Sequence, residues 1–282
     1  MIETGEPIFL SNLLLYPLIG DDKENGFSVL DELEGEVAIS ELSEARVDRI
    51  MIENNSDRPL VMIDGEEVVG AFQNRVVAAS SVLKPGSKSE ILTTCVEKGR
   101  WHGASTFNTG RTCSFPTIRA IIAEATIRKR SAQDKVWSRI DRKLKSTKTI
   151  SKTSSMHDIY ENLRDDLNRY VSEVEGIDAN GMLVTCGRRI LGLDYFSSHN
   201  LFDKFKEKLI RSYGLEAIDI TGPTRMKKVE PFIKSVFNGD GKWKKTKGGG
   251  HGSLDALLNK RLVARRLSYR RKMIHLSAFP VG

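Results

Sequence analysis

The sequence contains little cysteine and little histidine. Its 282 residues include three cysteines, Cys95, Cys113 and Cys186, and five histidines. Cysteines this few and this far apart exclude a disulfide framework, and the lack of a CxxC pair excludes a zinc site of local spacing. The histidines are isolated as well, so only the tertiary fold could bring metal ligands together. We therefore expect no metal ion and no cofactor.

Long hydrophobic runs are also absent. No run approaches the ~18 apolar residues that a membrane span needs. The first residues, MIETGEPIF, carry acids where a signal peptide carries a basic region. We therefore expect a cytoplasmic protein without membrane contact. The hydrophobic content of 39% and charged content of 29% are typical of a globular protein with a packed core.

Several catalytic motifs are missing too. The sequence has no GxSxG and no HExxH, and GGGHG at 248–252 lacks the preceding strand and the following GK[ST] of a P-loop. Only four residues separate Cys95 from Arg100, whereas a tyrosine-phosphatase loop has five. In addition, Glu97 places an anion where that loop would bind phosphate. These observations exclude the corresponding classes of enzyme.

The charge is distributed unevenly along the chain. Residues 1–100 hold 9 Lys and Arg against 19 Asp and Glu, and the other 182 residues hold 35 against 18. Residues 225–282 alone carry 15 basic and 3 acidic groups. The basic part is suited to attract polyanions. The alternative is an acidic lobe that packs near a basic lobe of one protein.

The hydrophobic pattern predicts an α+β protein in three parts. Residues 1–115 show short apolar runs between turn signals, which favours a β-rich, sandwich-like or barrel-like antiparallel sheet. Residues 116–180 have helical periodicity and are basic, and predict a helical hairpin insertion. Residues 181–282 predict a mixed part that ends in two closing strands.

Two helices carry more detail. Apolar residues from Met156 to Val174 are spaced 4-3-4-3-4, which favours one helix of a hairpin, with a self-association surface and a homo-oligomer as the alternative. A second helix is expected to begin with a cap at Ser198 or Asn200 and to end at Gly214.

Two neighbouring predicted strands, 68–77 and 92–101, gather polar residues. The turn LKPGSKS between them favours antiparallel pairing. The period of two places Gln73 and Arg75 on one face, and Cys95 and Glu97 on one face of the partner strand. A bend at Gly99 then turns the following residues, Arg100 and Trp101, away from the pleat.

This set of side chains suits a phosphate-containing ligand. Guanidinium groups such as Arg75 and Arg100 bind phosphates, the indole of Trp101 offers a stacking platform, and the amides of Gln73 and Asn74 bind hydroxyls. Glu97 is the candidate general base. Cys95 is a weaker candidate nucleophile, because a carboxylate nearby raises the pKa of a thiol. The alternative is structural: an Arg75–Glu97 ion pair, a buried Cys95 and a Trp101 that covers the core.

The same stretches resemble a known family. LVMIDGEEVVGAFQNRVV at 60–77 and CVEKGRW at 95–101 resemble the β-rich domain family named for its association with ADP-ribosyl glycohydrolase and rhodanese–phosphatase superfamily proteins. GRRILGLDYF, FDKFKEKLIRSYGLEA and MIHLSAFP resemble its C-terminal pattern. The resemblance implies a link to ADP-ribose, NAD-derived nucleotides or phosphate esters. It also implies ten polar positions: Glu66, Gln73, Asn74, Arg75, Cys95, Glu97, Arg100 and Trp101, with Asp194 and His275 as weaker candidates.

Two features depart from the family pattern. Phe72 stands where a lysine is expected, and the basic segment 128–155 is long and is interpreted as an insertion.

The expected function is binding, and as a further step hydrolysis, of a nucleotide or ADP-ribose-like phosphate compound. One alternative is nucleic-acid binding through the basic segment 128–152, which has ten Lys and Arg against two Asp, and through the loop 241–250. Another is a non-catalytic assembly protein. The sequence leaves open whether the protein is an enzyme.

Overall fold

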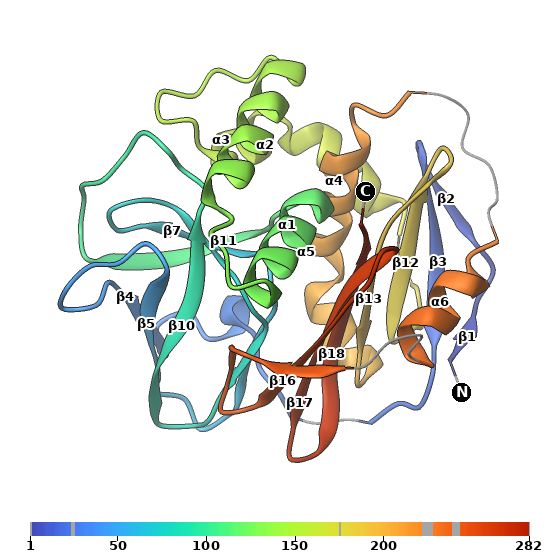
Figure 1. The fold of residues 1–282 in the computed structure, drawn as a ribbon, viewed down its shortest axis with the longest axis horizontal. Helices are drawn as coiled ribbons and strands as arrows, with labels where there is room; N and C mark the ends of the chain where they lie inside the picture. Colours follow the sequence, from blue (N-terminus) through green and yellow to red (C-terminus); the bar gives the residue numbers. More distant parts are fainter. Residues whose placement is uncertain (1, 24–25, 175, 222–227, 239–242, 282) are drawn as a thin grey trace.

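The computed structural model describes residues 2–23, 26–174, 176–221, 228–238 and 243–281. In Figure 1 a β-barrel lies on the left, a large sheet on the right, and helices α1 and α5 between them. These helices span Pro116–Ile127 and His199–Ala217. The predicted α+β class, rich in strands, is confirmed.

Six strands between Val37 and Cys113 form a closed antiparallel barrel. Around the barrel the strand order is β10-β5-β4-β11-β7-β8. The strands are β4 (Val37–Ser40), β5 (Arg49–Asn54), β7 (Glu66–Gly70), β8 (Arg75–Val77), β10 (Ser87–Cys95) and β11 (Thr106–Cys113). The sandwich-like part predicted from the sequence is thus a barrel, because β11 pairs with both β4 and β7 and closes the sheet on itself.

The large antiparallel sheet combines both ends of the chain. In the described ranges its order is β1-β3-β12-β13-β18-β17-β16-β14, with β2 paired to β3. Its strands are β1 (Glu3–Thr4), β2 (Ile8–Leu10), β3 (Leu13–Ile19), β12 (Gly181–Cys186), β13 (Arg189–Phe196), β14 (Lys244–Thr246), β16 (Ser253–Leu258), β17 (Leu262–Tyr269) and β18 (Lys272–Pro280). The predicted closing strands, β17 and β18, pair with each other.

A short third sheet links the two larger ones. Its order is β15-β9-β6, formed by β15 (Gly249–Gly250), β9 (Ser81–Leu83) and β6 (Leu60–Met62). The start of the chain belongs to the large sheet, because β3 pairs with β12 over residues 13–18. The domain boundaries near residues 115 and 180 stay a prediction.

Alternation along the strands explains the barrel interior. In β5, Ile50 and Ile52 are fully buried while Met51 and Glu53 are partly exposed, as a period of two requires. The apolar residues that fill the barrel come from all sides of it and from the single-turn 3₁₀ helix at Leu30–Glu32. They include Leu30, Ile39, Ile50, Ile52, Val68, Val77, Ile91 and Phe107.

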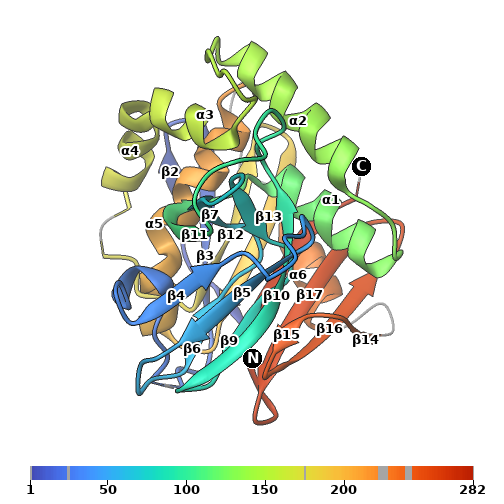
Figure 2. The ribbon, with the colours of Figure 1, turned by 90° about the vertical axis from the view of Figure 1, so that its left-hand side faces the viewer.

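Four helices cover one side of the barrel and its junction with the large sheet. After α1 come α2 (Gln133–Ser146), α3 (Met156–Asn162) and α4 (Arg164–Ser172). Their buried faces pack against Val76 and Val96 on the outside of the barrel. In Figure 2, α1 and α2 lie beside one end of β10. α6 (Glu230–Phe237) packs on the large sheet.

Two details of the predicted helices differ from the structure, and a third is confirmed. The apolar stripe from Met156 to Val174 is buried as expected, but the helix is broken at Leu163 into α3 and α4. Gly214 does not end α5: the helix continues to Ala217, and the Tyr170 ring packs against this glycine. Ser198 caps α5 as predicted, and its side chain accepts a hydrogen bond from Leu201 N at 3.1 Å.

Two predictions fall partly on residues without a described position. The sequence also predicts a short helix over residues 223–237 that begins near Pro223. Pro223 lies outside the described residues, as do residues 241 and 242 of the basic loop. None of the helices in the described ranges is both long and apolar enough to cross a lipid bilayer.

Candidate functional site

The two strands that carry the predicted site do pair. β10 is antiparallel to β8, and Cys95 lies opposite Arg75. Beyond Cys95 the chain leaves the barrel, and Gly99 N donates to Thr153 O at 2.8 Å. A side chain at Gly99 would meet the backbone of Thr153, since an added Cβ would lie 2.9 Å from its Cα. This close approach explains the glycine at the predicted bend.

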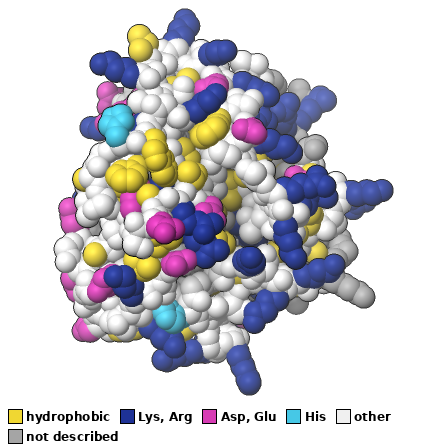
Figure 3. Space-filling model, turned by 60° about the vertical axis from the view of Figure 1, so that its left-hand side comes forward, with side chains coloured by type: hydrophobic (Ala, Val, Ile, Leu, Met, Phe, Trp, Pro, Cys, Tyr) yellow, Lys and Arg dark blue, Asp and Glu magenta, His cyan; other side chains and the backbone are white. Residues whose placement is uncertain are grey.

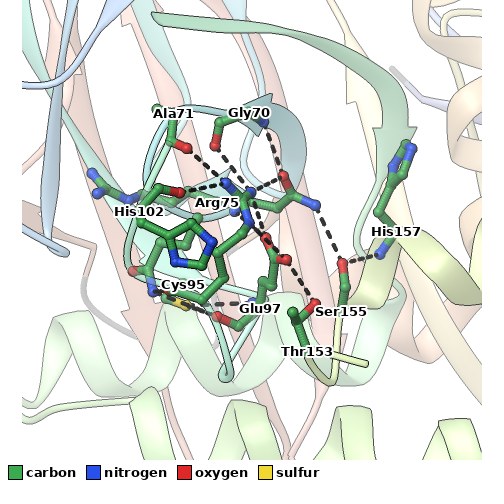
Figure 4. Close-up of polar contacts among 12 residues, drawn as sticks. Gly70, Ala71, Arg75, Cys95, Glu97, His102, Thr153, Ser155 and His157 are labelled. Atoms are coloured by element: carbon green, nitrogen blue, oxygen red, sulfur yellow. Dashed lines mark hydrogen bonds and ion pairs between the residues drawn. The ribbon is translucent and has the colours of Figure 1, made fainter. Parts of the chain in front are cut away.

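Glu97 lies in a polar network at this bend (Figure 4), and Arg100 is its main partner. Arg100 Nε donates to Glu97 Oε1 at 2.9 Å and Nη2 donates to Oε2 at 2.6 Å. Asn74 N and Thr153 Oγ1 donate to the same carboxylate, at 2.8 and 2.7 Å. Each oxygen of Glu97 therefore accepts two hydrogen bonds.

The same arginine holds the hairpin between β7 and β8. Its Nη1 donates to Ala71 O at 2.6 Å and to His102 O at 3.2 Å. Its Nη2 donates to Gly70 O and to Asn74 Oδ1, both at 3.1 Å. Because each nitrogen of the guanidinium has a protein acceptor, Arg100 fixes the hairpin and the loop that carries Trp101.

The ionisation of Glu97 follows from these contacts. Burial disfavours the charged carboxylate, but the hydrogen bonds from Arg100, Asn74 N and Thr153 outweigh it and lower the pKa. The side chain is 6% exposed. A general base needs a free lone pair that a substrate can reach. The geometry gives Glu97 a positioning role in the network.

Arg75 lies apart from Glu97. Its side chain is fully buried at the end of the barrel, where Nη2 pairs with Glu41 Oε1 at 2.7 Å. Its Nη1 donates to the carbonyl oxygens of Arg46 and Arg49, at 2.7 and 3.0 Å. The Trp101 ring centroid lies 5.7 Å from its guanidinium carbon. The Arg75 guanidinium thus packs against the Trp101 ring.

Cys95 is buried as well. Its Sγ contacts Glu97 O at 3.1 Å, and burial raises the pKa of the thiol more than the contacts with Glu97 O, Trp137 and Arg75 lower it. A thiol in this state is a poor nucleophile. The Cys95 backbone is paired with the amide of Gln133, which accepts from Cys95 N at 3.2 Å and donates to Cys95 O at 2.8 Å.

Three further predicted residues lie elsewhere. Glu66 is buried and accepts from Lys208 Nζ at 2.8 Å, and burial raises its pKa. Asp194 and His275 lie in a buried network between the barrel and the large sheet, where Arg119 binds Asp194 with distances of 2.6 and 2.9 Å. His275 Nε2 lies 3.1 Å from Asp194 Oδ1. All three are buried.

A cleft of about 810 Å³ opens between the end of β10 and the helices α1 and α2. Three predicted residues, Gln73, Arg100 and Trp101, line it. The remaining lining comes mainly from residues 47–49, from β10 and the turn after it, from α1 and α2 with their connection, and from Lys247. It includes Asp48, Arg49, Lys98, Lys129, Arg130, Gln133, Trp137 and Lys247.

The cleft is strongly basic. Its lining holds six cationic side chains and one carboxylate, Asp48. Arg100 and Arg49 are already paired with Glu97 and Glu90, whereas Lys129 and Arg130 are exposed and meet no carboxylate of the described chain at ion-pair distance. In the view of Figure 3, Lys and Arg side chains gather around a hollowed part of this face.

The helical wall of this cleft was not predicted from the sequence. The basic segment 128–152 was considered only for the alternative of nucleic-acid binding and was not connected with the strands. The available signal was the run Arg128–Arg130 next to Gln133 and Trp137, but only the tertiary fold brings that run beside β10. Among the described residues no group of three His, Cys, Asp or Glu side chains is arranged to hold a metal ion.

The fold and the cleft define a class: a strand-rich α+β protein whose barrel carries a basic, indole-lined opening at its rim. The chain belongs to the ARPP-1 family. The model of the ARG and Rhodanese-Phosphatase-superfamily-associated Protein domain matches residues 1–279, which confirms the resemblance inferred from the sequence. No curated protein and no solved structure matches the chain.

Proposed function

We propose that the cleft binds a nucleotide or an ADP-ribose-like compound through its phosphate groups. The observation that carries the proposal is the lining itself, in which six cations and two indoles meet a single carboxylate. Cations attract phosphate oxygens, and an indole provides a stacking surface for a base. A cleft of about 810 Å³ also falls within the size range of small-molecule sites.

Each lining group has a place in this proposal. Lys98, Lys129 and Arg130 bind the phosphates, and Trp101, which is 49% exposed, stacks on the base. Gln73 Nε2 donates to Glu97 O and Arg100 O, at 3.4 and 3.2 Å.

These two carbonyl acceptors fix the orientation of the Gln73 amide. Its Oε1 is buried and has no hydrogen-bond partner among the described groups. An acceptor left in this state favours a ligand with a donor, and a ribose hydroxyl is such a donor. Gln73 therefore supports a sugar-containing ligand over an inorganic phosphate.

Asn74, Arg75, Arg100 and Glu97 hold the site in this proposal and do not contact the ligand. Both oxygens of Glu97 already accept hydrogen bonds from the protein, so they do not favour its role as a general base. Hydrolysis with Glu97 as general base therefore stays a prediction from the sequence. We propose binding as the primary activity.

The test is calorimetric titration of the full chain with AMP, ADP-ribose and inorganic diphosphate. We expect ADP-ribose to bind, and Arg130→Glu to weaken it at least tenfold. Arg139→Glu is the matched control, since Arg139 is exposed on α2 and does not line the cleft. Equal affinities of the two variants, or no heat from any ligand at millimolar concentration, would refute the proposal.

A second candidate function is nucleic-acid binding. The observation in its favour is that α2 also exposes basic residues outside the cleft, among them Lys135 and Arg139. Binding of a single-stranded oligonucleotide should then weaken with salt by about 0.7 logarithmic units per phosphate contact. In that case Arg139→Glu would weaken binding as much as Arg130→Glu.

A further inference from the structure

The cleft has one indole on each of its walls. Trp101 belongs to the barrel side, where it lies edge-on to Phe72 with ring centroids 5.6 Å apart and an interplanar angle of 69°. Trp137 belongs to α2 on the helical side, and the ammonium of Lys98 lies 5.6 Å from its ring centroid. Two stacking surfaces therefore border one basic opening.

The open space beside Trp137 extends beyond the cleft. A second hollow of about 400 Å³ follows the exposed side of α2, and Lys98 and Trp137 line this hollow as well as the cleft. The indole of Trp137 therefore stands at the junction of the two spaces. A ligand that fills the cleft can continue past Lys98 to a second ring at this junction.

The two spaces differ in their balance of charge. The cleft has six cations against one carboxylate, Asp48. The hollow along α2 has Asp134 and Asp141 against Lys98, Arg142 and Lys145. Phosphate groups are therefore attracted more strongly to the cleft than to the hollow, which leaves the hollow for an uncharged base.

We propose that the ligand is a dinucleoside diphosphate, with one base on Trp101, the second on Trp137 and the diphosphate on Lys98, Lys129 and Arg130. This inference rests on the proposed function and adds the second base. It assigns Trp137 the role of selecting dinucleotides over mononucleotides, whereas Trp101 and the cations serve both.

The test compares ADP with diadenosine diphosphate and NAD by calorimetry on the full chain. Stacking of one further base on an aromatic side chain strengthens binding by about tenfold or more. We expect the dinucleotides to bind at least tenfold more tightly than ADP, and Trp137→Ala to abolish that gain, so that the variant binds ADP and the dinucleotides with equal affinity. Trp101→Ala weakens all three ligands.

The matched control is Trp243→Ala. The guanidinium carbon of Arg266 lies 4.6 Å from the ring centroid of Trp243. Trp243 does not line the cleft. Its replacement leaves the ratio of affinities unchanged.

A second measurement covers the case that Trp137→Ala fails to fold. In the variant Trp101→Phe/Trp243→Phe, Trp137 is the one remaining tryptophan, since the chain contains three. Its fluorescence should be quenched by diadenosine diphosphate and not by ADP.

The outcomes separate the two proposals. If ADP binds and the dinucleotides bind no more tightly, or quench Trp137 no more strongly, the inference is wrong and the proposed function stands. If neither ADP nor a dinucleotide binds, the proposed function itself fails. If a ten-nucleotide single-stranded oligonucleotide binds more tightly than both dinucleotides, the cleft is a nucleic-acid site and the inference is overturned.

Discussion

The ion pair of Glu97 and Arg100 allows a quantitative test of the network at the rim of the barrel. Glu97→Gln keeps the shape of the side chain and removes its charge. The carboxylate receives four hydrogen bonds, two of them from Arg100. After the substitution, the guanidinium would be left without a counter-ion in a site where its side chain is 19% exposed.

The expected loss follows from these contacts. Removing one partner of a buried ion pair costs about 3–5 kcal/mol. Arg100 retains some contact with water and several carbonyl acceptors, so we expect a smaller loss of about 2–3 kcal/mol in the free energy of unfolding. For a chain of this size, such a loss lowers Tm by about 5–10 °C.

The assay is urea and thermal unfolding followed by circular dichroism, with Glu90→Gln as the matched control. Glu90 accepts from Arg49 Nη1 at 2.8 Å, but its side chain is 46% exposed. Exposed pairs contribute about 0–1 kcal/mol. If Glu97→Gln destabilises the protein no more than Glu90→Gln, the network does not hold the hairpin as argued.

The pH dependence separates the charge from the shape of Glu97. Its folded pKa lies below the usual value of 4.5. Its stabilising contribution is therefore fully present above pH 4.5 and is lost as the pH falls through the lowered folded pKa. The gap in stability between wild type and Glu97→Gln should narrow in that acidic range. A gap that stays constant there would contradict the electrostatic explanation.

Three further predictions concern Arg119, His157 and the cysteines. Arg119→Met leaves Asp64 and Asp194 buried without their shared cation, so it should lower the free energy of unfolding in urea by about 3–5 kcal/mol; an unchanged midpoint would contradict the role of this network. The hydrogen bond to Glu67 raises the pKa of His157. The stability that protonated His157 adds is therefore fully present below its usual pKa of 6.5 and is lost as the pH rises through the higher folded pKa. The melting temperatures of wild type and His157→Gln should converge toward alkaline pH. The three cysteines are buried, and their thiols should react with a thiol reagent in urea but not in native buffer at pH 7; rapid native labelling would show that Cys95 is accessible.

The local pairing at the site could be predicted from the sequence. β10 does pair antiparallel with β8, with Cys95 opposite Arg75, although the turn LKPGSKS leads into β10 from β9, which pairs with β6 and β15. Gln73 and Glu97, which were expected on the same strands, lie just beyond the strand ends. The closure of the barrel could not be predicted, because it depends on β11 meeting both β4 and β7. Those contacts join segments that no turn connects.

The ion-pair partners of the charged residues could not be predicted from the sequence either. Arg75 was expected to meet Glu97 or phosphate, but its acidic partner is Glu41, 34 residues earlier in the chain. A strand pattern gives the face of a side chain and not the loop that covers it. The wall formed by Lys129 and Arg130 likewise depends on Gln133, whose amide joins α2 to the backbone of Cys95.

The contacts within the most distinctive motif explain why its charged pair does not bind the ligand in the proposal. The carboxylate and the guanidinium of CVEKGRW bind each other and the hairpin, which places Trp101 and Gln73 at the rim. Lys98 and Trp101 of the same motif line the cleft, together with Lys129 and Arg130 from the basic segment between α1 and α2. Substitutions of Glu97 or Arg100 should therefore reduce stability first, and substitutions at Lys129 or Arg130 should reduce ligand affinity at unchanged stability.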